Sequence, residues 1–146
     1  MIGLLQRVQA ARVTVEDRIL AEIDRGLLVL VGVERGDDER KTKRLLDRIL
    51  GYRVFPDSEG RMNLSLRDVD GALLLVPNFT LAADTGKGMR ASFTSVASPA
   101  EGELLFAYLV DYARHHHQTV RSGIFGAQMQ VSLTNDGPVT FWLKVS

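Results

Sequence analysis

The chain has 146 residues with an ordinary share of hydrophobic and charged residues, so we expect a single domain over residues 1–146. Its formal net charge of zero disfavours a protein that binds a long stretch of nucleic acid, although a small basic patch could still contact a nucleic acid end. The absence of cysteine excludes disulfides and cysteine-ligated metal. No apolar run approaches the ~20 residues of a membrane span, so we expect a cytoplasmic protein.

Strands are predicted over the first 33 residues. Residues 2–15 alternate between apolar and polar side chains, as a half-buried strand does, and residues 18–23 fit a second strand. The run GLLVLVGV at residues 26–33 is continuously apolar and rich in β-branched residues. Such a run is typical of a central strand that is buried on both faces.

A helix is predicted after Asp37 and Asp38, because acidic side chains suit the first turn of a helix. Apolar residues then recur at helical spacing as far as Gly51, where we expect the helix to end. A turn follows at residues 56–60. The run at residues 72–76 is predicted to be a buried strand that stops at Pro77, which cannot donate to a sheet.

The sequence SPAE at residues 98–101 has the spacing of a capping box, with proline at the first helical position, and predicts a second helix. Three histidines, residues 115–117, fall at its end. Consecutive helical residues point about 100° apart and cannot converge on one ion, so we expect no metal site there. Residues 129–133 and 139–145 are predicted to close the chain as two strands. The elements together predict an α/β fold with two main helices.

The segment NFTL, residues 78–81, is a candidate active site. A chain that leaves a buried strand here exposes backbone N–H groups, which are satisfied by water or by a ligand oxygen. Thr80 is the only hydroxyl nucleophile nearby, but a hydroxyl needs a base, and nothing in the sequence brings the histidines to it. A backbone oxyanion site is therefore the better hypothesis.

The loop DTGKGMR, residues 84–90, is similar to a phosphate-binding loop, but it lacks the first glycine and the Ser or Thr that a Walker motif requires. Lys87 and Arg90 are left either to contact a phosphate or to be solvated, and the sequence favours neither.

The segment TNDGPVT, residues 134–140, raises two interpretations. Asn-Asp-Gly favours a hairpin turn between the two final strands. The alternative starts from the proline, because an X-Pro bond can be cis. A cis Gly137–Pro138 unit could direct both of its carbonyl oxygens toward an ammonium group.

These segments, taken together, make the chain resemble the D-aminoacyl-tRNA deacylases, also called D-tyrosyl-tRNA deacylases. The resemblance extends almost from end to end and rests, in order, on LLQRV, GLLVLVGVERGDD, LGYRVF, MNLSL, FTLAADT, GMRASF and MQVSLTNDGPVTFWLKV. It implies a barrel-like sheet in a homodimer that uses no metal or other cofactor. It also implies hydrolysis of the ester between a D-amino acid, or glycine, and the terminal adenosine of tRNA.

The resemblance assigns roles to residues in two groups. The catalytic pocket is formed at Asn78, Phe79 and Thr80, largely by backbone groups, and the substrate's own 2′-hydroxyl assists the attacking water. The second group selects the hand of the substrate: a cis Gly-Pro enters the partner subunit's pocket, holds the amine and excludes an L-side chain. We expect this group to comprise Gly137 and Pro138, braced by Arg7, together with Phe125 and Met129 in substrate binding. Lys87 and Arg90 are separate candidates for contacts with tRNA phosphates.

Two features keep other functions open. Pro77 and Asn78 stand where the family usually has Ser-Gln, so a non-catalytic module that binds aminoacyl-tRNA ends is one alternative. A sister family in animals also begins this motif with proline and acts on mischarged L-alanyl-tRNA, but it lacks the arginine found here as Arg7. Trp142 lies on an otherwise polar strand face, which fits either a dimer interface or a small second core.

Overall fold

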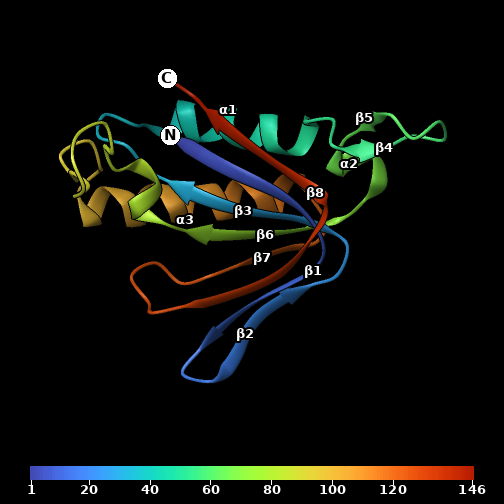
Figure 1. Cartoon of the computed structure of the whole chain (residues 1–146), viewed down its shortest axis with the longest axis horizontal. Coiled ribbons are helices and arrows are strands. Elements are labelled where there is room, and N and C mark those ends of the chain that lie inside the picture. The colour runs from blue at the N-terminus through green and yellow to red at the C-terminus, as the bar shows by residue number, and fades with distance from the viewer.

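The computed structural model describes all residues from 1 to 146 and is built around a strongly curved mixed sheet (Figure 1). The sheet runs in the order β2 (Arg18–Ile23), β1 (Ile2–Val15), β3 (Gly26–Gly32), β6 (Ala72–Pro77) and β7 (Val120–Ser122), and β8 (Gln130–Lys144) pairs with β1. A small hairpin comprises β4 (Phe55–Pro56) and β5 (Met62–Leu64). The helices are α1 (Glu39–Gly51), α2 (Leu66–Val69), α3 (Pro99–His116) and the 3₁₀ turn η1 (Phe79–Ala82).

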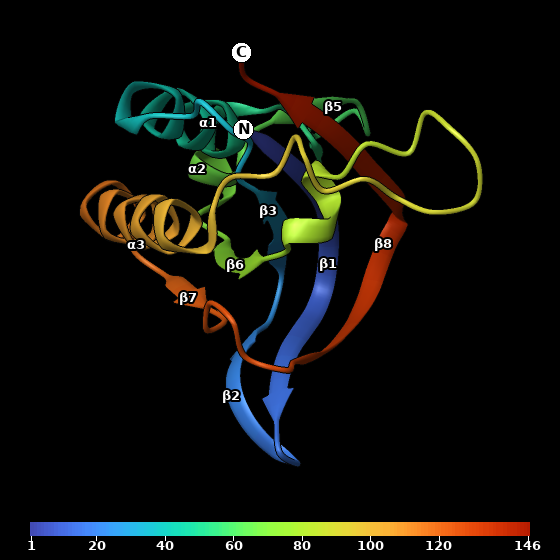
Figure 2. The same cartoon turned by 90° about the vertical axis from the view of Figure 1, so that its left-hand side faces the viewer.

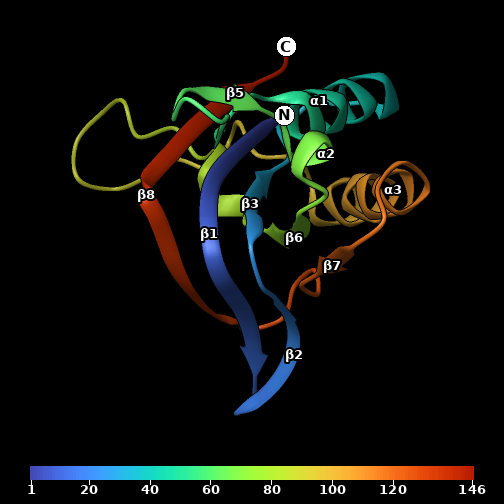
Figure 3. The same cartoon turned by 90° about the vertical axis from the view of Figure 1, so that its right-hand side faces the viewer.

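The long strand β1 organises the sheet. Its first half pairs antiparallel with β3 and its second half with β2, while β8 pairs along both halves. A strand that changes partners along one edge has to bend, and Figures 2 and 3 show β1 and β8 curving together into a nearly closed barrel. The predicted strands at residues 2–15 and 18–23 are thereby confirmed.

The predicted helices are also confirmed, with one difference at a cap. Asp38 caps α1 by accepting a 2.8 Å hydrogen bond from the amide of Lys41. Ser98 caps α3 in the same way, from the amide of Glu101, but no return bond from the Glu101 side chain is formed. The full capping box is at Ser65 and Asp68 instead, where it begins the short helix α2, which the sequence did not predict.

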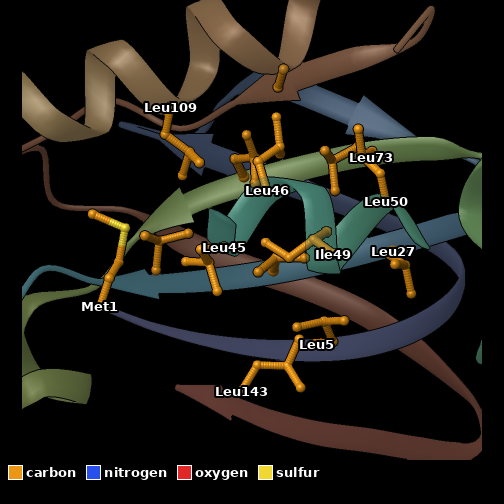
Figure 4. Close-up of a cluster of buried hydrophobic side chains, with 14 of the residues drawn as sticks. Met1, Leu5, Leu27, Leu45, Leu46, Ile49, Leu50, Leu73, Leu109 and Leu143 are labelled. Carbon is orange, nitrogen blue, oxygen red and sulfur yellow. The ribbon is translucent and has the colours of Figure 1, made fainter. Parts of the chain in front are cut away.

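Two hydrophobic clusters occupy opposite faces of the sheet. The larger one lies between the sheet and the helices α1 and α3, and Figure 4 shows its leucines meeting there. The smaller one holds only eight buried residues, on the concave face. β3 lies between the two clusters and is buried on both faces, as predicted from its continuous apolar run.

The end of the chain differs from its predicted form. Residues 129–133 and 139–145 are not two separate strands, and residues 134–140 do not make a hairpin turn. Both halves belong to β8 and pair with β1: Leu133 faces Ala11, and Phe141 faces Leu5. Two strands of a hairpin would pair with each other. The long edge of β1 accommodates both halves instead, and residues 136–139 form a wide bulge opposite the single residue Arg7.

The three histidines lie at the end of α3, as predicted, and their rings are directed at different backbone carbonyls. His115 and His116 contact the oxygens of Asp111 and Tyr112 on their own helix, whereas His117 contacts Gly71, which precedes β6. None of the helices combines the length and the apolar composition that a membrane-spanning helix needs.

A partly buried ionic cluster joins the first residue to the segment that follows β3. The α-ammonium of Met1 lies 2.9 Å from a carboxylate oxygen of Glu34, from one of Asp37 and from the carbonyl of Val145. Lys144 contacts the second oxygen of Glu34 at 3.1 Å. Burial raises the pKa of Glu34, but the hydrogen bonds and positive charges of Met1 and Lys144 outweigh it and hold the pKa below its usual 4.5.

The substitution Glu34→Gln should lower the free energy of unfolding at pH 7 by roughly 1–3 kcal/mol, because a charged acceptor is lost. A carboxylate with a depressed folded-state pKa contributes stability above its unfolded pKa, and this contribution disappears as the pH falls through the folded value. The parent should therefore lose stability below about pH 4.5 more steeply than the variant. Urea titrations at pH 7 and pH 3.5 test this, with the exposed Glu103→Gln as the control; parallel losses in all three proteins contradict the assignment.

Candidate active site

A short 3₁₀ turn at the end of β6 presents free backbone donors. The strand extends to Pro77, which still pairs with Val31, and the Asn78 amide donates to the Val31 carbonyl at 2.8 Å. The first bond inside η1 is from the Leu81 amide to the Asn78 carbonyl, at 3.2 Å. The amides of Phe79 and Thr80 precede it and have no partner within the turn, as is usual for the first donors of a helical turn. Both residues are exposed, so the two N–H groups are available to a ligand oxygen.

The side chains of Asn78 and Thr80 are bonded to each other. The Thr80 hydroxyl donates to the Asn78 amide oxygen at 2.5 Å. The Thr80 proton is thus engaged by a neutral amide, which is no base, and the arrangement does not activate Thr80 as a nucleophile. The Asn78 Nδ2 group makes no hydrogen bond within the chain, so it is a third free donor beside the two amides.

These residues lie at a groove of about 600 Å³, within the usual size range of a small-molecule site. Four of the residues predicted from the sequence line it or its rim: Asn78, Phe79, Phe125 and Met129. Phe79 is 58% exposed and its ring lies 5.5 Å from that of Phe93. The sequence did not predict the strand residues that complete the wall, among them Gln6, Leu28, Leu30, Val76, Val131 and Leu133.

Two glycines let Phe125 and Met129 reach their positions. A Cβ on Gly102 of α3 would lie 3.0 Å from the Phe125 ring, and a Cβ on Gly123 would lie 2.7 Å from the Met129 sulfur. The signal for the groove's far wall was therefore present in the sequence as glycines. It could not be interpreted without knowing which side chains approach them.

The Gly-Pro bulge of β8 is braced by Arg7. The guanidinium donates to the Asp136 carbonyl at 3.1 Å and to the Val54 carbonyl at 2.7 Å, which ties the bulge to the segment after α1. The side chain of Arg7 is only 12% exposed. The Gly137–Pro138 peptide bond is cis, as the resemblance implied, and both residues are exposed.

The bulge and the groove do not meet within one chain. No residue from 135 to 139 lines the groove. The structure therefore brings Asn78, Phe79, Phe125 and Met129 together, with Thr80 beside them, and places Arg7, Gly137 and Pro138 elsewhere. Lys87 and Arg90 are exposed on the loop of residues 83–98, which Figure 2 shows projecting from η1.

Comparison with known proteins decides which family this site belongs to. The profile of a family described as D-Tyr-tRNA(Tyr) deacylase matches residues 4–144. The chain belongs to that family. It is 62% identical to a D-aminoacyl-tRNA deacylase of Alkalilimnicola ehrlichii over 99% of this chain and 96% of that protein. It is 55% identical to one of Escherichia coli over 99% of this chain and the whole of the other.

Two solved structures have the same fold as this chain. One described as c-Myc DNA Unwinding Element Binding Protein superposes with a TM-score of 0.96 at 32% identity and covers 100% of this chain and 99% of its own. A probable eukaryotic D-amino acid tRNA deacylase superposes with a TM-score of 0.82 over 99% of this chain and 98% of its own; at 17% identity it supports the fold alone. The family predicted from the sequence is thus confirmed, and with it the enzyme class: a D-aminoacyl-tRNA deacylase, which is a hydrolase.

Proposed function

We propose that this chain, as a homodimer, hydrolyses the ester between a D-amino acid, or glycine, and the terminal adenosine of tRNA. The observation that carries the proposal is the pair of free amides at Phe79 and Thr80 on the rim of an apolar groove. An ester carbonyl attacked by water becomes a tetrahedral oxyanion, and fixed N–H donors stabilise that charge. Each such donor is often worth about 3 kcal/mol in the transition state.

No protein base is required for the attack in this proposal. The nearest hydroxyl, that of Thr80, already donates a hydrogen bond to Asn78 and takes no part in the proton transfer. The ribose 2′-hydroxyl beside the ester assists the attacking water. The chain supplies the position of the ester and the donors for the oxyanion, and it uses no metal or cofactor.

A second copy of the chain completes the site. The groove lacks Gly137 and Pro138 of its own chain, so a substrate that meets both the groove and the bulge must lie between two copies. The outer edge of β8 has no strand partner, and Trp142 on this strand is 55% exposed. Exposed aromatic residues of this kind are enriched at protein interfaces.

The bulge of the partner subunit then selects the hand of the substrate. L- and D-esters carry identical groups, so attractive contacts discriminate poorly between them, whereas a rigid wall penalises only one hand. The carbonyls of the Gly-Pro unit hold the α-ammonium and leave no room for an L-side chain. Glycine has no side chain to exclude and is therefore accepted.

The deciding experiment measures the release of tyrosine from D-tyrosyl-tRNA and L-tyrosyl-tRNA at equal, low enzyme concentration, with glycyl-tRNA and L-alanyl-tRNA in parallel. Rapid loss of only the D-ester and the glycyl ester is the expected result. Binding without turnover of any ester would identify a non-catalytic module, and turnover of L-alanyl-tRNA alone would identify the other editing activity. Sedimentation equilibrium of the same protein should give twice the mass of one chain.

A further inference from the structure

The solvent face of α1 carries a row of positive charge outside the site described above. Arg40, Arg44 and Arg48 follow one another at four-residue intervals, so they share one side of the helix and span about 12 Å along its axis. Lys43 lies beside the row. Arg40 and Arg44 are exposed and form no ion pair or side-chain hydrogen bond within the chain, and Arg48 reaches only the Lys144 carbonyl, at 3.4 Å, and the ring of Tyr52.

This row costs the isolated helix stability. Like charges four residues apart destabilise a helix by about 0.2–0.5 kcal/mol per pair, and the row contains two such pairs. The acidic residues of α1, Glu39 and Asp47, form no ion pair with the row, and the basic residues of the helix outnumber them. A polyanion laid along this face would remove the repulsion.

The row is connected to the candidate active site through the preceding loop. The amide of Arg35, just before α1, donates to the Ser95 carbonyl at 2.9 Å, and Glu34 pairs with Val96. The segment before α1 is thereby fastened to the 83–98 loop, which starts at η1 and carries Lys87 and Arg90. Exposed basic residues therefore occur along this connection, at Lys87, Arg90 and Arg35, interspersed with the acidic residues Asp84, Glu34, Asp37 and Asp38.

We propose that this basic face of α1 binds the phosphate backbone of the tRNA acceptor stem while the esterified 3′ end occupies the groove. The proposal rests on the proposed function, because it names the part of the same substrate that lies beyond the active site. Arginine contacts to phosphates position a nucleic acid without reading its sequence, as an enzyme acting on several tRNAs needs. A net charge of zero does not exclude such a surface, because the charge of one element can differ from that of the whole chain: α1 carries five basic residues and two acidic ones.

The test uses two double variants. The α1 variant carries both Arg40→Gln and Arg44→Gln, and the matched control carries both Arg18→Gln and Arg61→Gln. Both pairs remove two exposed positive charges, and glutamine is a good helix former. Arg18 is the first residue of β2, and Figure 1 shows the turn between β1 and β2 at the opposite end of the molecule from α1. The first measurement is the affinity for uncharged tRNA at salt concentrations between roughly 50 and 200 mM, because the salt dependence of binding reports the number of phosphate contacts. The second is kcat/KM on D-tyrosyl-tRNA and on the phosphate-free ester D-tyrosyl-adenosine.

We expect the α1 variant to bind tRNA about tenfold more weakly at the lowest salt, and its salt slope to fall by about 0.9 for each lost contact. Turnover of D-tyrosyl-adenosine should stay unchanged, and the control should match the parent in every measurement. Parent-like tRNA affinity and slope in the α1 variant overturn the proposal, and so does an equal loss of turnover on both esters. If the parent cleaves neither ester, the proposed function fails, and the tRNA affinities still decide whether α1 binds RNA.

Discussion

The substitution Arg7→Ala should relax the preference for D- over L-tyrosyl-tRNA by at least about tenfold, because a weakened wall no longer excludes the L-side chain. The guanidinium holds the carbonyls of Asp136 and Val54 from a half-buried position in β1. Its removal leaves both acceptors without their charged donor and frees the bulge to move. A hydrogen bond to a charged group is worth about 1.5–3 kcal/mol, so the free energy of unfolding should fall by a similar amount. Initial rates on both esters and a urea titration measure the two effects.

Two further variants separate bracing from charge. Arg7→Lys keeps the charge, but a single ammonium cannot reproduce the planar fork that reaches both carbonyls, so its selectivity should lie close to that of the alanine variant. Arg12→Ala removes an exposed arginine from the same strand and should leave both selectivity and stability at parental values. An alanine variant that keeps full selectivity despite reduced stability would show that Arg7 supports the fold alone.

The parts of the fold that the sequence predicted are those specified by local patterns. Alternation over residues 2–15, the apolar run at 26–33 and the acidic start of α1 each depend on neighbours along the chain, and each prediction is confirmed. The same holds for Ser98 and Pro99, which begin α3 as expected. Local side-chain chemistry decides such features before any tertiary contact is made.

The parts that failed depend on partners distant in sequence. Residues 134–140 have good turn chemistry, but β1 offers a free edge to both flanking segments, and pairing with that edge outweighs a local hairpin. Phe141 alternates with the buried Val139 and Leu143, yet it is 36% exposed, with its ring 5.6 Å from that of Tyr52. The bend of β8 at the bulge changes which side chains its alternation buries.

The candidate site shows the same division. The free amides of Phe79 and Thr80 were predictable, because a chain that leaves a buried strand exposes backbone N–H groups, although the first of them, that of Asn78, still donates to Val31. Gln6, Leu30 and Val131 were not, since they line the groove only after β1, β3 and β8 have curved around it. The proposed placement of Gly137 and Pro138 in a partner's groove came only from the resemblance, because within one chain they lie away from the groove.

The second large effect is expected at Asn78. Asn78→Asp replaces the free Nδ2 donor by a carboxylate oxygen beside the amides of Phe79 and Thr80, where the oxyanion would form. Loss of one oxyanion donor costs about 10²–10³ in kcat, and an added negative charge repels the same oxyanion, so kcat should fall by at least about 10²-fold while KM changes little. Single-turnover rates on D-tyrosyl-tRNA provide the measurement. Asn78→Gln, which introduces the residue usual in the family, should remain within about tenfold of the parent because the donor is retained.

The matching variants at Thr80 assign the hydroxyl its role. Thr80→Val removes the hydrogen bond that fixes the Asn78 side chain but keeps the backbone amide, so kcat should fall by only about tenfold, in proportion to one neutral hydrogen bond. Thr80→Ser restores the hydroxyl and should restore the rate. If Thr80 were the nucleophile, the valine variant would lose all turnover with an intact fold, and the parent would accumulate a covalent tyrosyl-enzyme detectable by mass spectrometry. The hydroxyl's bond to a neutral amide oxygen favours the first outcome, because a nucleophile needs its proton aimed at a base.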